Sequence, residues 1–207
     1  MNKEEQTQLN EKLILAVKNG DLTLIKSLLE NEADIHAWDD KSLRVAAENG
    51  HLEVVKYLVE QGANIHAQND YSLKVVAENG HLEVVKYLVG KGADIHAKED
   101  WSLRMATING NLEIVKYLIE HGANIHAEND DALKSASENN QLDILKYFLF
   151  DCKMEIQEEI KDWLIENNQH QTLNLIEKRD SIMKNYENLE KLKKNDSVDN
   201  LKKKVKL

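Results

Sequence analysis

The sequence predicts an all-α solenoid in which pairs of short helices stack along one axis, with shortened loops and little or no β-structure. Three observations predict this fold class. A 30-residue unit repeats along the chain, apolar residues within each unit follow helical spacing, and proline is absent from all 207 residues. One such pair cannot bury its apolar face alone, so neighbouring units must stack to form a continuous core.

Four successive segments share the repeated unit. The segment at 33–62 returns at 63–92 with 22 of 30 positions identical. It returns again at 93–122 and, with its glycines replaced, at 123–152. A looser copy of the second half of the unit occupies residues 13–32. Self-similarity at a fixed period of this length is typical of repeat architectures.

Each unit contains the signals of two helices. In the second copy Asp70 is a candidate N-cap residue, because its carboxylate could accept from the amides of Ser72 or Leu73. Gly80 then ends the first helix in the left-handed conformation. The second helix follows as HLEVVKYLV and stops before Gly92. The same aspartate position recurs in the other copies at Asp40, Asp100 and Asp130.

This pattern divides the chain into four parts. Residues 1–32 are predicted to form an N-terminal capping repeat, and residues 33–152 form the four 30-residue repeats. The period degrades after that point, so residues 153–179 are predicted to be degenerate C-terminal capping helices. Residues 180–207 are low in apolar content and rich in lysine and asparagine, which predicts a basic, partly disordered tail.

Composition limits the class of protein further. Residues 1–177 carry 17 Lys or Arg against 32 Asp or Glu, whereas residues 178–207 carry 10 against 5. The single cysteine, Cys152, excludes an intramolecular disulfide and zinc modules of the CxxC type. No run approaches the roughly 20 apolar residues that span a bilayer, and the N-terminal residues lack the apolar core of a signal peptide. We therefore predict an intracellular protein, cytoplasmic or nuclear, without a membrane partner.

The stretch ENGHLEVVKYLVEQGANIHA, residues 48–67, resembles the most diagnostic part of the ankyrin repeats. The resemblance covers about residues 11–152 and implies an ankyrin-type solenoid. This chain departs from the family upstream, where the usual β-turn finger and Thr-Pro-Leu-His are replaced by a segment three residues shorter that reads Tyr-Ser-Leu-Lys. The finger should therefore be truncated. The 30-residue form, with His-Ala where Asn-Ala is usual, resembles repeats encoded by giant DNA viruses, which implies a viral product in an infected host cell.

Histidines are the main candidates for metal or catalytic chemistry. Four of the eight share one repeat position: His36, His66, His96 and His126. Neighbouring helices lie about 8–10 Å apart, so these side chains are too far from one another to share a zinc ion with ligands at about 2.0–2.1 Å. We interpret them as hydrogen-bonding residues of the turn. With no phosphate-binding glycine loop and no paired nucleophile and base, we predict no enzyme activity, no cofactor and no metal.

Positions that vary between otherwise near-identical copies predict the binding surface. We number the positions of each unit from its first residue, which is residue 33 in the first copy. Positions nine, twelve and sixteen lie at i, i+3 and i+7, so they share one face of the first helix. The ankyrin resemblance implies that loop tips and first helices line a concave surface on which partners dock. The candidate partner-binding residues are Trp38, Lys41, Arg44, Tyr71, Lys74, Lys98, Trp101, Arg104, Ile108, Asp131 and Lys134.

Two interpretations of this face stay open. A cation follows each aspartate by four residues, as Arg44 follows Asp40, which predicts a row of i to i+4 ion pairs worth about 0.2–0.5 kcal/mol each. Alternatively, these cations contact a partner. Ile108 stands where the sibling copies have glutamate, beside Trp101 and Arg104, and this combination is typical of a binding hot spot. The alternative for Trp101 is that it covers a neighbouring loop.

The sequence thus predicts a monomeric, non-enzymatic module that binds another protein, of unknown identity, through its loop tips and concave face. One alternative is an adaptor that recruits a host enzyme such as a ubiquitin ligase. Another makes the basic cluster at 202–206 a nuclear or nucleic-acid anchor, with the repeats as a spacer. The acidic body and the lack of interleaved aromatic residues in the cluster argue against nucleic acid as the main ligand.

Overall fold

The computed structural model describes the backbone of residues 2–205 and the side chains of residues 2–191. All regular structure in the described part of the chain is helical, and this part contains no strand. The predicted all-α fold with little or no β-structure is therefore confirmed. The chain separates into two compact units, Met1–Ile144 and Leu145–Leu207.

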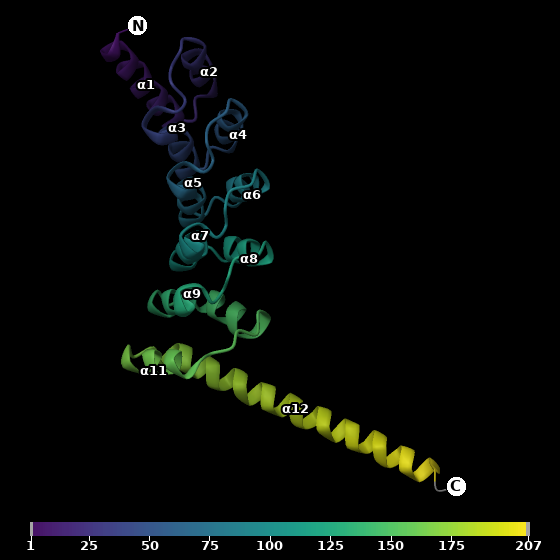
Figure 1. Cartoon of the computed structure of the whole chain (residues 1–207). Helices are drawn as coiled ribbons and strands as arrows, with labels where there is room; N and C mark the ends of the chain where they lie inside the picture. Colours follow the sequence, from purple (N-terminus) through teal and green to yellow (C-terminus); the bar gives the residue numbers. More distant parts are fainter. Residues whose placement is uncertain (1, 206–207) are drawn as a thin grey trace. The chain divides into compact units, whose positions relative to one another are not determined.

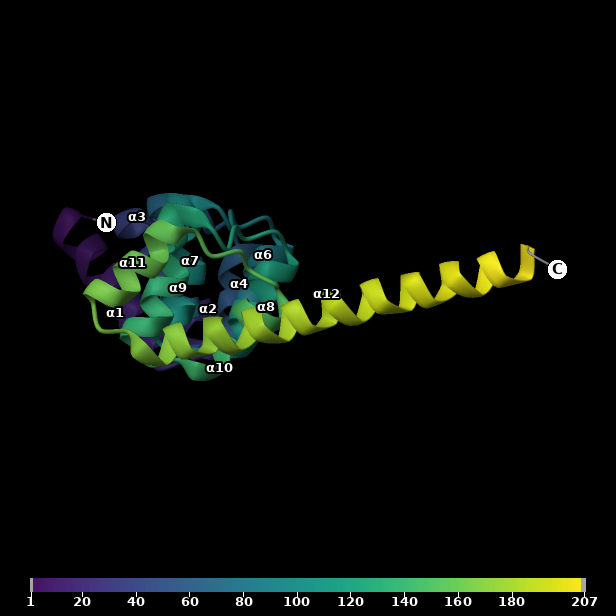
Figure 2. The ribbon, with the colours of Figure 1, turned by 90° about the horizontal axis from the view of Figure 1, so that it is seen from below.

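The first unit is a stack of helix pairs (Figure 1). The first helices of the pairs are α1 (Lys3–Lys18), α3 (Ala37–Glu48), α5 (Ala67–Glu78), α7 (Ala97–Ile108) and α9 (Ala127–Glu138). The second helices are α2 (Leu22–Glu30), α4 (Leu52–Glu60), α6 (Leu82–Gly90), α8 (Leu112–Glu120) and the start of α10 (Leu142–Lys146). First and second helices form two columns side by side, and Figure 2 views this stack from one end.

Apolar side chains at equivalent positions form the core of the stack. Leu43, Leu73, Leu103 and Leu133 of the first helices are each at most 1% exposed. Leu58, Leu88 and Leu118 of the second helices are 0% exposed. Each first helix from α1 to α7 packs against the first helix of the next pair and against its own second helix. This nearest-neighbour burial is the continuous core that the 30-residue period predicts.

A left-handed turn begins each first helix of the four repeats. In α5, Gln68, Asn69 and Asp70 have φ angles of 53°, 57° and 55°. Residues with a side chain occupy this region at a cost of about 1–2 kcal/mol each, and Asn and Asp tolerate it best. The same three-residue turn recurs at 38–40, 98–100 and 128–130. This compact turn takes the place of the longer β-turn finger.

The aspartate at the end of this turn binds the following repeat. Asp70 is 5% exposed, and its Oδ1 accepts from the backbone N–H of Asp94 at 2.9 Å. The prediction that Asp70 caps its own helix through Ser72 or Leu73 is therefore wrong. The left-handed backbone turns the carboxylate away from its own helix, toward the next repeat. Equivalent bonds join Asp40 to Asn64 (2.8 Å), Asp100 to Asn124 (3.0 Å) and, in the first pair, Asn10 to Asp34 (2.8 Å).

A second set of bonds joins consecutive pairs at the start of the second helices. Nε2 of His81 lies 3.1 Å from the carbonyl oxygen of Glu48, and Nε2 of His51 lies 2.9 Å from that of Lys18. These carbonyls end the preceding first helix, where they have no partner within the helix. Asn111 and Gln141 donate from their side-chain amides to Glu78 and Ile108 at 3.0 and 2.8 Å. We name His51, His81, Asn111 and Gln141 the staple residues.

Gly50 lies against a staple residue, which makes a stability prediction possible. Its φ is +69°, and a Cβ atom there would lie 2.5 Å from Nδ1 of His81. Gly92 is the matched control, because its φ is +95° but a Cβ atom would meet nothing within 4 Å. We expect Gly50→Ala to lower the free energy of unfolding by about 1 kcal/mol more than Gly92→Ala, since only Gly50→Ala displaces a staple. Chemical denaturation measures both, and equal losses would contradict the role of the staple.

The second unit contains a π-helical segment, η1 (Tyr147–Asp151), and the helices α11 (Glu158–Glu166) and α12 (His170–Val205). Both η1 and α11 pack against α12. The helix α12 runs without a break through residue 180, where we predict the change from capping helices to tail. The side chains of the basic cluster at 202–206 lie outside the described residues. Among the described helices, none is long and apolar enough to cross a bilayer.

Candidate functional site

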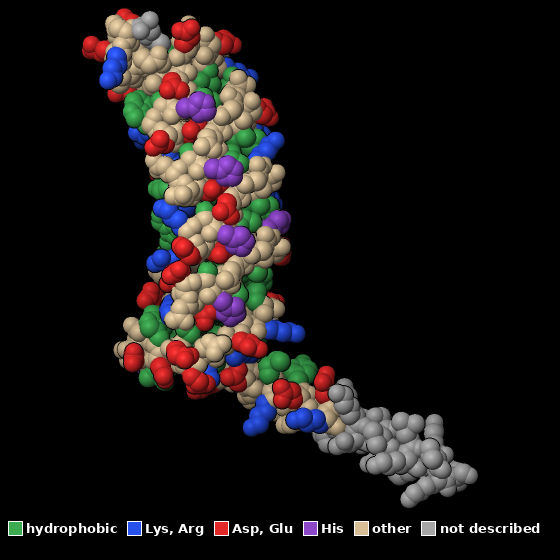
Figure 3. Space-filling model, viewed as in Figure 1, with side chains coloured by type: hydrophobic (Ala, Val, Ile, Leu, Met, Phe, Trp, Pro, Cys, Tyr) green, Lys and Arg blue, Asp and Glu red, His purple; other side chains and the backbone are tan. Residues whose placement is uncertain are grey.

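The candidate binding residues lie on the first helices of the stack and on the turns that begin them. We name this set the first-helix face, and it consists of Trp38, Lys41, Arg44, Tyr71, Lys74, Lys98, Trp101, Arg104, Ile108, Asp131 and Lys134. The residues come from α3, α5, α7 and α9, so stacking places equivalent positions of adjacent repeats near one another. Hydrophobic and basic side chains alternate along the left edge of the stack in Figure 3, on the side of the first helices.

Aromatic rings and cations from three repeats meet at the centre of this face. The rings of Tyr71 and Trp101 contact edge to face, with centroids 6.4 Å apart and planes at 78°. Nζ of Lys74 lies 5.2 Å from the centroid of Tyr71 and 5.1 Å from that of Trp101. Arg44 lies 5.7 Å from the Tyr71 ring, and Lys98 lies 4.6 Å from the Trp101 ring. The four cation-to-ring distances are within the range of a cation–π interaction. We name these five residues the aromatic cluster.

Lys74 and Arg104 of this face are paired with carboxylates. Lys74, whose side chain is 12% exposed, forms an ion pair with Glu78 of its own helix. Nε of Arg104 lies 2.7 Å from Oδ2 of Asp131 in the next repeat. The side chains of that second pair are 48% and 28% exposed, so solvent screens it and it contributes about 0–1 kcal/mol.

The predicted row of ion pairs from each aspartate to the cation four residues later is wrong for Arg44, Lys74 and Arg104. Those aspartates are buried and bind the following repeat. Arg44 instead donates from its guanidinium to the backbone carbonyl of Trp38 at 2.8 Å and to that of Asp39 at 3.4 Å. Arg44, Lys74 and Arg104 therefore do not pair with the aspartate row.

The residues of the predicted hot spot have different surroundings. Trp101 is half-buried in the aromatic cluster, while Arg104 is engaged by Asp131. Ile108 is also half-buried. Sequence reasoning missed the contact between Tyr71 and Trp101, although a signal was present. Both rings occupy position nine of the unit in adjacent repeats, and stacking brings equivalent positions together.

A model of ankyrin repeats, three copies, matches residues 13–99 and 73–162. Together the two matches cover more than half of the chain. The chain belongs to the ankyrin-repeat family. No curated protein matches it. Ankyrin repeats are generally protein–protein interaction modules, and their fold is typically non-enzymatic. Within this ankyrin stack, the first-helix face is the surface that combines variable positions with exposed charge and aromatic rings.

The histidines of the ankyrin loops hydrogen-bond to the buried aspartates. In each repeat the histidine Nδ1 lies 2.5–3.1 Å from Oδ1 of the aspartate four residues later, at His36, His66, His96 and His126. Figure 3 shows histidine side chains in a row along the stack. Over the described residues, no group of three or more His, Cys, Asp or Glu could hold a metal ion. These contacts agree with the interpretation of the histidines as hydrogen-bonding residues of the turn.

Cys152 in the second unit has a free thiol. Burial raises the pKa of its thiol, and a hydrogen bond with Tyr147 partly offsets this increase. A raised pKa favours the protonated thiol at neutral pH, and the thiol is a weaker nucleophile than the thiolate. Cys152 is also half-buried. Its surroundings therefore do not activate it for catalysis.

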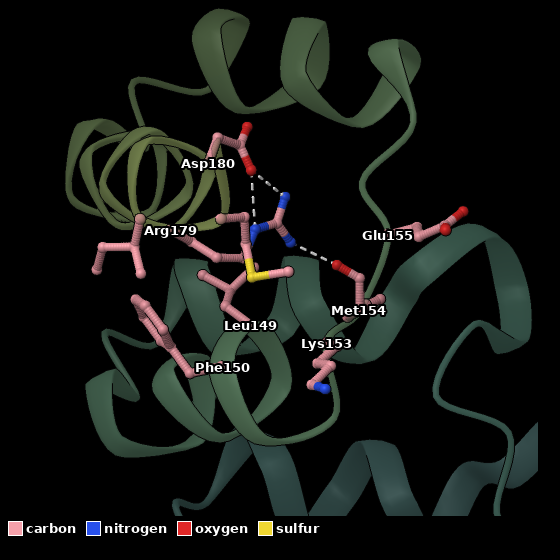
Figure 4. A pocket seen from close by; sticks show the side chains of 9 residues that line it. Leu149, Phe150, Lys153, Met154, Glu155, Arg179 and Asp180 are labelled. Atoms are coloured by element: carbon pink, nitrogen blue, oxygen red, sulfur yellow. Dashed lines mark hydrogen bonds and ion pairs between the residues drawn. The ribbon is translucent and has the colours of Figure 1, made fainter. Parts of the chain in front are cut away.

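The second unit also contains a cavity of about 330 Å³ (Figure 4). Leu149, Phe150, Ile182 and Met183 supply much of its apolar lining. The guanidinium of Arg179 lies at this cavity and donates to the backbone carbonyl of Met154 and to the carboxylate of Asp180. Because these acceptors already occupy the arginine, the cavity offers mainly apolar contact. Sequence reasoning did not predict this cavity.

Proposed function

We propose that this ankyrin chain is a non-enzymatic module that binds another protein through its loop tips and first-helix face. The aromatic cluster carries the proposal, because it brings two half-buried rings and three cations together along the first helices of three consecutive repeats. Tyrosine, tryptophan and arginine are the residues most enriched at interface hot spots. The general role of ankyrin repeats in protein binding supports the same conclusion.

The variation between repeats also supports this choice of surface. The core leucines are the same in each repeat, whereas position nine reads Lys41, Tyr71, Trp101 and Asp131. Packing explains the constant positions, since a change of even one methylene in a core is unfavourable. A partner with a different group opposite each repeat explains the variable ones.

Site-specific photocrosslinking tests the proposed surface. A photoreactive amino acid at Lys41, an exposed position of the first-helix face, is expected to crosslink to a protein partner in a cell extract. The same group at Lys86, exposed on the second helix α6, is the control and is expected to give no such product. Crosslinking from Lys86 but not from Lys41 would show that the partner binds the opposite side of the repeats.

The alternative of a functional basic tail leads to a separate prediction. We expect deletion of residues 195–207 to leave partner capture intact, because the proposed surface lies in the first unit. We also expect the melting temperature to stay nearly unchanged. If capture is abolished by the deletion while the melting temperature is kept, the tail is the binding element and the first-helix face is not. Thermal unfolding and capture on the same two proteins distinguish these results.

Compartment and assembly state are parts of the same proposal. We propose that the module acts as a monomer inside a cell, in the cytoplasm or the nucleus. The resemblance of the 30-residue unit to viral repeats supports an infected host cell as its setting. In the adaptor alternative, the chain recruits a host enzyme such as a ubiquitin ligase through its ends instead of through the first-helix face.

A further inference from the structure

We propose that the partner segment is extended and acidic, with two carboxylates about four residues apart on either side of an apolar or aromatic side chain. This inference rests on the proposed function and specifies the chemistry of the partner. The carboxylates bind Arg44 and Lys98, and the side chain between them packs on Tyr71 and Trp101.

Unpaired positive charge on the first-helix face is the first step of the argument. Among the side chains that the structure describes, Lys41, Arg44 and Lys98 form no ion pair with a carboxylate. Arg44 uses its guanidinium on the carbonyls of Trp38 and Asp39, and neutral carbonyls do not cancel its charge. Arginine in particular recognises carboxylates through paired hydrogen bonds.

The spacing of Arg44 and Lys98 determines the length of the ligand. Arg44 lies on α3 and Lys98 on the turn that begins α7, which are two steps apart in the stack. Arg44 lies 5.7 Å from the Tyr71 ring, that ring lies 6.4 Å from the Trp101 ring, and Lys98 lies 4.6 Å from the Trp101 ring, so the two cations are at most about 17 Å apart. An extended chain advances about 3.3 Å per residue and alternates its side chains between two faces, so side chains about four residues apart point the same way and reach both cations.

The aromatic rings determine what lies between the two carboxylates. Tyr71 and Trp101 are half-buried; Tyr71 comes from the middle repeat of this span and Trp101 from the repeat that contains Lys98. They offer apolar surface midway along the ligand. Glu99 and Glu128 line the same shallow cleft as Lys98, so the acidic segment should approach this lysine from the side of Trp101, whose ring lies 4.6 Å from Nζ.

A short acidic peptide fits this charge distribution better than a nucleic acid does. Residues 1–177 have a net charge of −15, from 17 Lys or Arg and 32 Asp or Glu. The Debye length is about 8 Å at physiological ionic strength, so a peptide carboxylate senses mainly the cation it contacts. A polyphosphate chain places charges all along its length, and many of them would lie against the acidic surroundings.

Three labelled synthetic peptides test the inference by fluorescence anisotropy on the full chain. The first has two glutamates about four residues apart and a phenylalanine midway, so that all three side chains point the same way. The second replaces both glutamates by glutamine, and the third places the two glutamates next to each other, on opposite faces of an extended chain. We expect the second and third peptides to bind about tenfold more weakly than the first, with the affinity of the first decreasing as salt is added.

Matched variants identify the cations that bind the acidic peptide. Arg44→Gln and Lys98→Gln are each expected to weaken the binding of the acidic peptide by about three- to tenfold. Lys86→Gln removes the same charge from α6, outside the first-helix face, and should leave the affinity unchanged. Arg44 also holds two loop carbonyls, so thermal unfolding checks that variant, and Lys98→Gln tests the inference where no such bond is lost.

Four results would overturn the inference: no binding of the acidic peptide, equal binding of its glutamine analogue, equal weakening by Lys86→Gln, or tighter binding of a single-stranded oligonucleotide through Arg44 and Lys98. The proposed function is tested separately by the same experiment. If the glutamine peptide binds as well as the acidic one and loses affinity in Trp101→Ala, the first-helix face binds protein and the acidic chemistry is wrong.

Discussion

Asp70→Ala is expected to lower the free energy of unfolding by about 3 kcal/mol. The carboxylate of Asp70 is 5% exposed and accepts from the N–H of Asp94 at 2.9 Å, while Nδ1 of His66 lies 3.0 Å from it. Removing the carboxylate leaves both nitrogen atoms without this partner and opens a gap between two repeats. An unsatisfied donor costs about 1–3 kcal/mol. Equilibrium denaturation in urea measures the loss.

The chain itself supplies two controls for this prediction. Asp70→Asn should cost less than about 1 kcal/mol, because Asn10 already accepts from the N–H of Asp34 in the first pair. Asp130→Ala should cost about half as much as Asp70→Ala. Asp130 is 3% exposed and binds His126, but among the described residues it accepts from no backbone N–H. Equal losses in the two alanine variants would show that the bond between repeats is not the source of the stability.

Trp101→Ala is expected to weaken partner binding by about 2 kcal/mol or more, which is about a 30-fold loss of affinity. The substitution removes the larger ring of the aromatic cluster, and with it the contacts of Tyr71 and Lys98. A half-buried tryptophan also contributes to stability, so a loss of affinity alone does not separate binding from folding. Titration of the purified partner, with thermal unfolding of the same variant, measures both effects.

Ile108→Glu separates an effect on binding from an effect on folding. It restores the residue that the sibling repeats carry, as at Glu78, and adds an i to i+4 partner for Arg104, so the fold should be kept. Binding should nevertheless weaken, because a charge replaces apolar surface within the first-helix face. If Ile108→Glu binds normally and Trp101→Ala loses only stability, Trp101 covers its neighbours and is not a hot spot.

The helices and core could be predicted from the sequence because burial repeats with the same period as the residues. Leu43 and Leu73 show the same helical spacing and the same burial in each copy. The loops could not be predicted in this way. Asp70 has the local signal of an N-cap residue, yet its acceptor role is decided by a backbone N–H 24 residues later. The preference of aspartate for an N-cap position takes no account of the N–H of Asp94, so the tertiary contact overrides this local preference.

The candidate site was predictable in its members but not in its arrangement. Comparing the copies selected Trp101 and Arg104 from their positions on one helix, and the structure gives each a partner from a different neighbour. Trp101 meets Tyr71 of the preceding repeat, whereas Arg104 pairs with Asp131 of the following one. Helical spacing describes which residues share a face. The contacts between residues of different repeats also depend on the distance between those repeats, which the spacing within one helix does not determine.

The staple residues and buried aspartates have a consequence for how the gene for this chain can change. Asp40, Asp70 and Asp100 each bind an N–H 24 residues later, and each staple residue binds a carbonyl 33 residues earlier, so a whole repeat can be removed with these bonds re-formed at the junction. Excision of residues 63–92 would bring the N–H of Asp94 to Asp40 and the amide of Asn111 to the carbonyl of Glu48, in place of Asn64 and His81. Recombination between the near-identical copies can therefore lengthen or shorten the binding surface one repeat at a time, without a compensating substitution.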